Sequence, residues 1–281
     1  MSDMGQDMSA EWKEFEEASE SVLESKLPVF VRLDGNSFSK LTSTHFEKPF
    51  DALFDEAMNR AAVAVLQYCA GAQLAYVQSD EMTVVLRNDQ KDTTDPFLGN
   101  RTQKLASLLA ATASVHFNEA LRELTGKSHL AVFDARSFTV PNTLYHVNGC
   151  LNARQRDCYR NTLGSALYWT MRQSEGSGRK QAARWMHGKK VRELLPKLAE
   201  FGVTKETLGD HKLYGRVFTR NTYECLVREA MPEEKFRTLV ERGHLEEDEM
   251  TMRHKWEVME KTPRFEHDPA FVAAFFDFES E

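Results

Sequence analysis

Two acidic clusters, each placed directly after a short apolar run, constrain this chain more than any other feature. Asp34 follows the run Pro28–Leu33, and the pair Asp80 and Glu81 comes just after the run Gln73–Val77. Because such runs predict strands, pairing of the two strands would bring Asp34 and Asp80 together at one edge of a sheet. Carboxylates at such an edge repel each other unless cations lie between them. The pattern therefore predicts two hard divalent cations that hold a nucleoside triphosphate for phosphoryl transfer.

The spacing of apolar residues along the first half predicts an alternation of strands and helices. We expect a helix over 11–25, a strand over 28–33, a helix over 50–69, strands over 73–78 and 82–87, a polar loop over 88–99, a helix over 101–124 and a strand over 129–133. An extension of the last strand to Val140 is left open. The order β-α-β-β-α-β is the ferredoxin-like split unit, which palm domains of polymerases and nucleotide cyclases share. The predicted fold class is therefore α+β.

The second half of the chain is expected to be a mostly helical extension of this palm. We predict helices over 149–173, 181–199 and 204–209, a hairpin over 212–229 and an acidic helical tail over 232–261. Residues 1–145 would then form the palm-like catalytic domain with its N-terminal helix, and residues 146–281 would complete the site and contact RNA. The aromatic segment Pro269–Phe278 is expected to pack on the same chain or on a partner.

Composition and charge narrow the classes of protein. Hydrophobic residues make up 41% and charged residues 28%, which is ordinary for a soluble globular protein. No apolar run reaches the length of a membrane span and the N-terminus lacks the pattern of a signal peptide, so we expect a cytoplasmic protein without membrane contact. The net charge of −7 disfavours nucleic acid, but residues 179–192 carry six Lys or Arg and no acid. That segment is either a basic face for RNA or a solvated helix surface.

The residues around both clusters suit a nucleotide bound through metal. Gly35 lets the backbone bend so that its carbonyl can reach the same ion as Asp34, which makes Asp34, Gly35 and Asp80 the predicted metal ligands. The next four residues would offer backbone N–H groups to a triphosphate. These are Asn36, Ser37, Phe38 and Ser39. A plain Asp-Gly turn is the alternative, which the second carboxylate pair disfavours. Asp80 is expected to bridge the metals, with Glu81 as a peripheral or water-mediated ligand.

Several side chains elsewhere are candidates for contacts with phosphate. Lys48 precedes a predicted helix, Arg101 and Lys104 are spaced i, i+3 at the start of another, and Arg136 follows a predicted strand. Each has an ordinary alternative: an exposed lysine, a solvated helix start or a structural salt bridge. On the predicted helix 149–173, Arg154, Asp157 and Asn161 share one polar face, which lies either on a cleft or in solvent.

Five motifs occur together: RLDGNSF, HFEKPFD, YVQSDE, FDAR and RQRDCYRN. In this order and spacing they resemble the tRNA-His guanylyltransferase family, also called the 3′–5′ polymerase family, over residues 28–173. The resemblance implies a palm with two Mg²⁺ ions on Asp34, Gly35 and Asp80. It implies nucleotide contacts from residues 34–39 and from Ser79 and Asp80. Asn161, on the polar face of the predicted helix, is a further candidate for nucleotide binding. Triphosphate or tRNA 5′-end contacts are implied for Lys48, Arg101, Lys104 and Arg136.

The resemblance also implies an activity and its partners. ATP would activate a 5′-monophosphate on tRNA or another RNA, and GTP would then be added in the 3′–5′ direction by a homo-oligomer, a tetramer or a dimer. Eukaryotic members that act on tRNA-His carry a His-Ile-Asn-Asn tetrad where this chain has Tyr159, Arg160, Asn161 and Thr162. We therefore expect template-dependent repair of RNA 5′ ends, with dedicated tRNA-His guanylylation as the alternative.

Two other hypotheses on function are alternatives to a nucleotidyltransferase. A palm-fold nucleotide cyclase would use similar carboxylates, but it needs a GGDEF-like turn where this chain has QSDE. A non-catalytic RNA-binding protein of the same fold has no reason to hold two mutually repelling carboxylates together.

Overall fold

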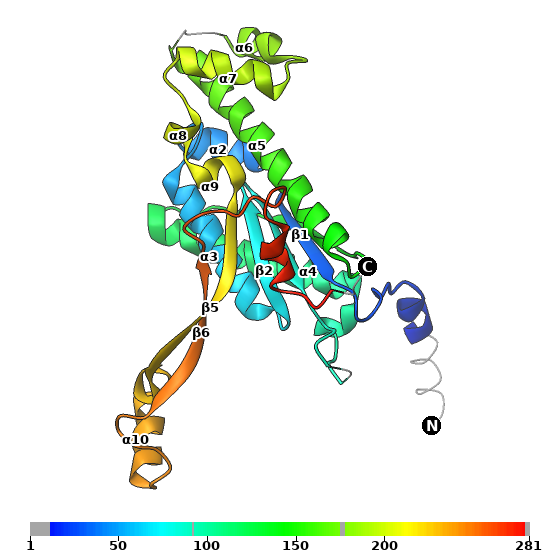
Figure 1. Cartoon of the computed structure of the whole chain (residues 1–281), viewed down its shortest axis with the longest axis vertical. Helices are drawn as coiled ribbons and strands as arrows, with labels where there is room; N and C mark the ends of the chain where they lie inside the picture. Colours follow the sequence, from blue (N-terminus) through cyan, green and yellow to red (C-terminus); the bar gives the residue numbers. More distant parts are fainter. Residues whose placement is uncertain (1–11, 92, 175–177, 279–281) are drawn as a thin grey trace.

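A single antiparallel sheet organises the molecule. The computed structural model describes residues 12–91, 93–174 and 178–278. Its six strands lie in the order β4-β1-β3-β2-β5-β6, and every neighbouring pair is antiparallel (Figure 1). The strands are β1 (Val29–Gly35), β2 (Ala72–Gln78), β3 (Glu81–Leu86), β4 (Phe133–Thr139), β5 (Arg216–Leu226) and β6 (Met250–Val258).

Two helices connect the first four strands as the sequence predicted. These are α3 (Ala52–Tyr68) and α4 (Thr102–Thr125). The order β1, α3, β2, β3, α4, β4 and the strand order β4-β1-β3-β2 are those of the ferredoxin-like split unit, so the predicted fold class is confirmed. The remaining helical elements are α2 (Phe38–His45), η1 (Phe97–Asn100), α5 (Leu144–Ser174), α6 (Arg179–Met186), α7 (Val191–Glu200), α8 (Lys205–Leu208), α9 (Asp210–Tyr214), η2 (Val227–Glu229), α10 (Glu233–Glu241) and α11 (Pro269–Ala273).

Alternation along the strands gives the sheet two different faces. On β1, Val31 and Leu33 point into the apolar cluster that also contains α3 and α4. Phe30 points the other way, into a second cluster that contains α5 and the C-terminal segment. Arg32 and Asp34 share the face of Phe30 because their positions differ from it by even numbers, so this face becomes polar toward the end of the strand.

The long helix α5 joins the sheet to a small helical layer. Its first half packs on the sheet through Val147 and Leu151. Its second half packs through Leu163 and Leu167 against the helices α6 to α9, of which α6 and α7 lie at its far end (Figure 1). The aromatic C-terminal segment packs into the same cluster as the first half of α5, through Phe276 among others, so its partner is the same chain.

Strands β5 and β6 extend beyond the body of the molecule. β5 pairs with β2 only over Arg216–Thr219, whereas it pairs with β6 as far as Leu226. The two strands form an arm that carries α10 at its tip (Figure 1). Since β5 extends the palm sheet, the sheet crosses the predicted boundary at 145/146; the division into two domains stays a prediction.

Several predicted elements differ from the structure. The fourth strand is β4, the extension past Phe133, because Leu130 is 98% exposed and residues 128–132 form no strand. The hairpin over 212–229 is wrong: β5 pairs with the distant β6, which replaces much of the predicted helical tail. The helix over 181–199 is broken between α6 and α7.

Two further differences concern helices. The helix α2 was not predicted, because its sequence FSKLTSTH has little apolar periodicity. At the N-terminus, residues 12–18 are helical and residue 11 lies outside the described residues. Within the described part of the chain, no helix is long and apolar enough to cross a membrane.

Candidate active site

The two acidic clusters meet at one end of the sheet, as predicted. The backbone N–H of Gly35, at the end of β1, donates to the carbonyl of Asp80 in the β2–β3 turn over 3.0 Å. In the strand register Asp34 lies opposite Glu81 on one side and opposite Asp134 on the other. The sheet therefore gathers four carboxylates at this end, of which Asp134 was not among the predicted site residues.

The electrostatics of Asp34 and Asp80 suit a cation. Loss of hydration raises the pKa of the Asp34 carboxyl, and Asp134 raises it further while Arg32 and Arg136 oppose the shift. Burial also raises the pKa of Asp80, to which Asp34 adds, whereas Ser79 and Lys48 oppose it. Both shifts mean that the anionic forms lack sufficient positive charge within the chain itself.

Hard oxygen donors of this kind fit Mg²⁺. Among the described residues, no cluster of three or more His, Cys, Asp and Glu side chains is arranged to hold a metal. Asp34, Asp80 and the Gly35 carbonyl would have to hold the ion together with oxygens of a nucleotide. Mg²⁺ in proteins is commonly coordinated by one or two carboxylates together with substrate phosphates.

The turn after Asp34 is shaped by a buried ring. A Cβ atom at Gly35 would lie 2.5 Å from the Phe38 ring, so only glycine fits. Phe38 is buried and packs at 4.9 Å between ring centroids against Phe133. The Phe38 side chain therefore anchors the turn, and only its backbone remains to contact a nucleotide.

The helix α2 begins at this turn with free amide groups. Ser37 adopts a left-handed conformation, φ 59°, and donates its hydroxyl to Asn36 Oδ1 without capping the helix. The N–H groups of Phe38 and Ser39 are thus available to an anion. Asn36 differs from the prediction, because its N–H already donates to the Val132 carbonyl over 2.8 Å.

Glu81 is held by arginines. Arg154 Nη1 lies 3.4 Å and Arg32 Nε 3.8 Å from its carboxylate, and Gln78 Nε2 donates to it over 3.0 Å. Burial raises the pKa of Glu81, while the two arginines act against that shift. With these partners Glu81 is placed to position the site, in keeping with the peripheral role predicted for it.

Lys48 approaches the site from the segment before α3. Burial lowers its pKa and the charge of Asp80 opposes that shift, which places the ammonium near the Asp80 carboxylate. Its Nζ lies 5.8 Å from the centroid of the Trp169 ring on α5, and the Gln173 side chain donates to its carbonyl over 3.0 Å. The structure thus brings Lys48 to the acidic cluster.

Arg136 also lies at the site, whereas Arg101 and Lys104 do not. Arg136 is opposite Arg32 on β4 and close enough to lower the pKa of Asp34. β3 runs away from Asp34 before the loop that leads to α4, so α4 begins at the far end of the sheet. There Arg101 lies 3.0 Å from Glu20. Within one chain, Arg101 and Lys104 are therefore remote from the carboxylates.

The remaining predicted residues are placed as follows. Ser79 forms the exposed turn beside Asp80 with a φ of 48°. Asn161 is exposed on α5. Sequence reasoning missed Arg32, Asp134 and the contact of Arg154 with Glu81. Period-two alternation could have found the first two, because they share the sheet face of Asp34.

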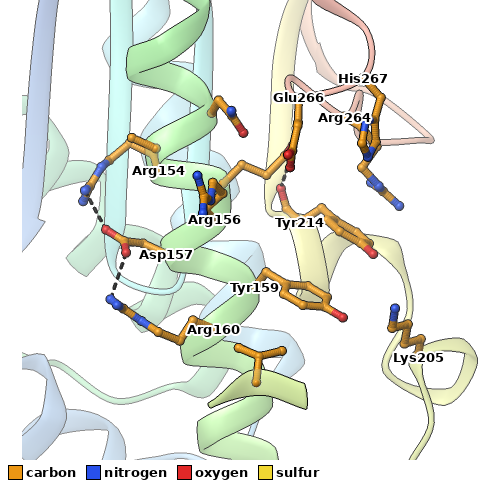
Figure 2. Close-up of a pocket in the computed structure, with 14 residues that line it drawn as sticks. Arg154, Arg156, Asp157, Tyr159, Arg160, Lys205, Tyr214, Arg264, Glu266 and His267 are labelled. Atoms are coloured by element: carbon orange, nitrogen blue, oxygen red, sulfur yellow. Dashed lines mark hydrogen bonds and ion pairs between the residues drawn. The ribbon is translucent and has the colours of Figure 1, made fainter. Parts of the chain in front are cut away.

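A hollow of about 780 Å³ lies beside this site, on the outer side of α5 (Figure 2). α5 lines it together with the start of α8, the end of α9 and the segment before α11. Arg154 connects the two places, because it contacts Glu81 at one side and Asp157, a lining residue, at 2.6 Å. Asp157 in turn binds Arg160 at 2.8 Å.

Comparisons with known proteins agree with this geometry. A family model described as tRNAHis guanylyltransferase matches residues 9–141. A probable tRNA(His) guanylyltransferase of Drosophila melanogaster is 30% identical over 189 residues, which cover 64% of this chain and 62% of that protein. An uncharacterized protein of Acanthamoeba polyphaga mimivirus is 31% identical over 173 residues, covering 54% of this chain and 59% of that protein.

Solved structures extend the likeness over nearly the whole chain. A bacterial tRNA(His) guanylyltransferase-like protein in complex with ATP superposes with a TM-score of 0.73 and 26% identity, covering 95% of this chain and 97% of that one. In sequence and in fold, this chain is therefore similar to tRNA(His) guanylyltransferases. A bacterial family structure in complex with GTP has a TM-score of 0.71 at 25% identity, over 96% and 98% of the two chains.

These similarities confirm the resemblance predicted from the sequence. The chain spans 59% and 62% of the lengths of the two relatives named above, from the mimivirus and from Drosophila. The matched stretch contains Asp34, Asp80 and Lys48, whereas α5 and the arm lie beyond residues 9–141.

Proposed function

We propose that the chain is a Mg²⁺-dependent nucleotidyltransferase that adds nucleotides, GTP preferentially, to the 5′ end of tRNA or another 5′-monophosphorylated RNA. The observation that carries the proposal is the Gly35–Asp80 hydrogen bond, which fixes the Asp34 and Asp80 carboxylates at one sheet edge. The free amides at the start of α2 and the ammonium of Lys48 lie around the same edge. The bacterial neighbours with bound ATP and GTP support nucleotide binding.

The proposed reaction has two steps, activation of the RNA 5′ end and addition of the nucleotide. In the first, an oxygen of the RNA 5′-monophosphate attacks the α-phosphorus of ATP, so that pyrophosphate leaves and a 5′-adenylylated end forms. In the second, the 3′-hydroxyl of GTP attacks the 5′-phosphorus of the RNA, AMP leaves and a 3′–5′ phosphodiester bond forms. No side chain of the protein has to act as a covalent nucleophile.

The residues of this chain have separate tasks in these steps. Asp34, Asp80 and the Gly35 carbonyl would hold Mg²⁺, which when bound neutralises triphosphate charge and lowers the pKa of the attacking hydroxyl. Lys48 and the N–H groups of Phe38 and Ser39 bind and orient the triphosphate. Glu81 lies between Arg32 and Arg154, so it fixes the end of the strand.

Template-dependent repair is the form of this activity that we propose. The position where eukaryotic members that act on tRNA-His carry histidine is Tyr159, whose ring stacks on Tyr214 with centroids 5.4 Å apart. Lys205, 5.5 Å from the Tyr159 ring centroid, completes the surroundings. This aromatic and cationic setting differs from the His-Ile-Asn-Asn tetrad that the dedicated activity implies.

A transfer assay tests the proposal. The protein is incubated with Mg²⁺, ATP, α-labelled GTP and two 5′-monophosphorylated tRNAs, one full-length and one lacking its first nucleotide. We expect label on the truncated tRNA, lost in Asp34→Asn and Asp80→Asn and kept in Glu123→Gln, a matched surface carboxylate on α4. Label mainly on full-length tRNA-His would favour dedicated guanylylation, and no RNA labelling at all would refute both forms.

A further inference from the structure

The hollow on the outer side of α5 has the size and charge of a binding site for a phosphate-bearing ligand. Its volume of about 780 Å³ lies in the range of small-molecule sites. Five of its lining side chains are Arg or Lys and two are Asp or Glu, although the whole chain carries a net charge of −7. A local excess of positive charge on an acidic protein marks a surface for an anion.

Not every cationic side chain in the hollow forms an ion pair with a carboxylate of the described residues. Asp157 is shared between Arg154 and Arg160, and Arg264 binds Asp210 over 2.6 Å. Arg156, in contrast, has no carboxylate within ion-pair distance among the described residues, and it is exposed. Lys205 is exposed as well; its ammonium interacts with the Tyr159 side chain but has no carboxylate within ion-pair distance among the described residues. These two cations therefore remain to meet a ligand.

The wall of the hollow is rigid where it carries aromatic rings. Tyr159 and Tyr214 stack at 19° between ring planes, and the guanidinium of Arg264 lies 3.1 Å from the Tyr214 ring centroid. Gln155, buried behind them, donates to the carbonyls of Tyr214 and Pro263. Figure 2 shows the two tyrosine hydroxyls pointing to the same side, toward Lys205. A fixed row of hydroxyl and cationic donors suits phosphate oxygens.

The position of the hollow selects the kind of ligand. Arg154 separates it from Glu81 by a single side chain. A hollow of this volume can admit a single RNA strand more readily than a double helix. Unpaired strands are also the parts of RNA that enter protein pockets. When the 5′ end of a duplex is being extended, the nucleotides that are still unpaired are the 3′ extension of the opposite strand.

We propose that this hollow binds the backbone of the unpaired 3′ strand opposite the 5′ end under extension, with phosphates on Arg156 and Lys205. The inference rests on the proposed function and deepens it, because this strand is the one that serves as template. Binding there keeps the template beside the carboxylates, because the ion pairs of Arg154 with Glu81 and with Asp157 connect the hollow to the site.

The test compares two RNA hairpins on the full-length protein. Both are 5′-monophosphorylated; one ends in four unpaired 3′ nucleotides and the other is blunt. The variant Arg156→Gln/Lys205→Gln removes the two exposed cations, and Arg60→Gln/Arg122→Gln removes the same charge from exposed positions on α3 and α4. Dissociation constants are measured over a range of salt concentrations, together with GTP affinity.

We expect the wild type and the control variant to bind the tailed hairpin about tenfold more tightly than the blunt one. The hollow variant should lose most of this preference, and the slope of log affinity against log salt for the tailed RNA should fall by roughly 1.4, for two lost contacts with a single strand. Its GTP affinity should stay unchanged. An unaltered preference, an equal loss for both hairpins, or a loss confined to GTP would each overturn the inference. RNA labelling by the wild type in the transfer assay separates that failure from a failure of the proposed function.

Discussion

The face of the sheet against α3 and α4 is apolar along β1, β2 and β3, whereas the face under α5 is apolar at only one end. On the first face Val31, Leu33 and Val84 are completely buried. On the second, Phe30 is buried at one end, and Arg32 and Asp34 follow on the same strand toward the other. One strand thus supplies core packing with its odd positions and residues of the candidate active site with its later even positions.

On the face under α5, some buried polar atoms have no hydrogen-bond partner among the described residues. The Nε of Arg32, the Oε1 of Gln78 and the hydroxyl of Thr83 are buried without a hydrogen-bond partner among the described residues. Buried polar groups without partners cost stability. Packing on the α3–α4 side therefore contributes most of the stability, whereas the α5 side retains polar groups at the expense of stability.

The largest expected effect is a loss of transfer activity on substitution of a carboxylate on the face under α5. Asp34→Asn should reduce GMP transfer to RNA by on the order of 10³-fold, since the charge that holds the cation is lost. The free energy of unfolding should not fall, because Asp34 lies opposite another carboxylate, Asp134. Transfer assays and urea unfolding measure the two quantities. Glu123→Gln, at an exposed carboxylate on α4, is the control, and an equal loss of activity in both variants would contradict the assignment of Asp34.

The opposite pattern is expected on the apolar face. Phe117, on α4, is fully buried and packs against the rings of Phe38 and Phe54, so Phe117→Ala should lower the free energy of unfolding by about 3–5 kcal/mol. Val115→Ala, at an exposed position of the same helix, should change it by less than about 0.5 kcal/mol. If the folded Phe117 variant lost GTP affinity as strongly as Asp34→Asn, the separation between the faces would be wrong.

A smaller effect is expected where the polar face meets α5. Arg154→Met leaves Glu81 with Arg32 at 3.8 Å as its remaining arginine, and should lower the free energy of unfolding by about 1.5–3 kcal/mol. Arg154→Lys keeps the charge but not the fork that reaches Glu81 and Asp157 together, so it should recover only part of the loss. Unfolding curves for both variants test this, and a Met variant as stable as the wild type would rule out the link.

The smallest expected effect is a gain. Thr83→Val replaces a buried hydroxyl that has no partner among the described residues by a methyl group of similar shape. We expect the free energy of unfolding to rise by about 1 kcal/mol, with transfer activity retained. Thermal and urea unfolding measure the change. A clear destabilisation would show that this hydroxyl is used, and the polar face would then be better satisfied than we describe.

The sequence predicted the elements whose patterns arise locally. β1, β2, β3, α3 and α4 have strong apolar periodicity, and their structural bounds lie within about two residues of the predicted ones. The helix α2 was missed because it is held by one buried residue, Phe38, beneath an otherwise polar sequence. β6 was taken for helix, since MTMRHKWEV becomes a strand only by pairing with β5, far away in the sequence.

The candidate site divides in the same way. Asp34, Gly35 and Asp80 could be predicted because each lies at the end of a recognisable strand. The link from Arg154 to Glu81 joins residues 73 positions apart, and no local pattern contains it. Arg101 and Lys104 show the converse: helical spacing placed them on one face, but only the strand register reveals that this helix begins at the remote end of the sheet.

Metal-dependent GTP binding tests the central claim most directly, namely that the polar end of the sheet binds a nucleotide through Asp34 and Asp80. Calorimetric titration with GTP would be run on the wild type and Asp80→Asn, each with Mg²⁺ and with EDTA. We predict binding by the wild type in Mg²⁺, weakened at least about tenfold by EDTA or by the substitution. Equal affinity in all four titrations would contradict the claim.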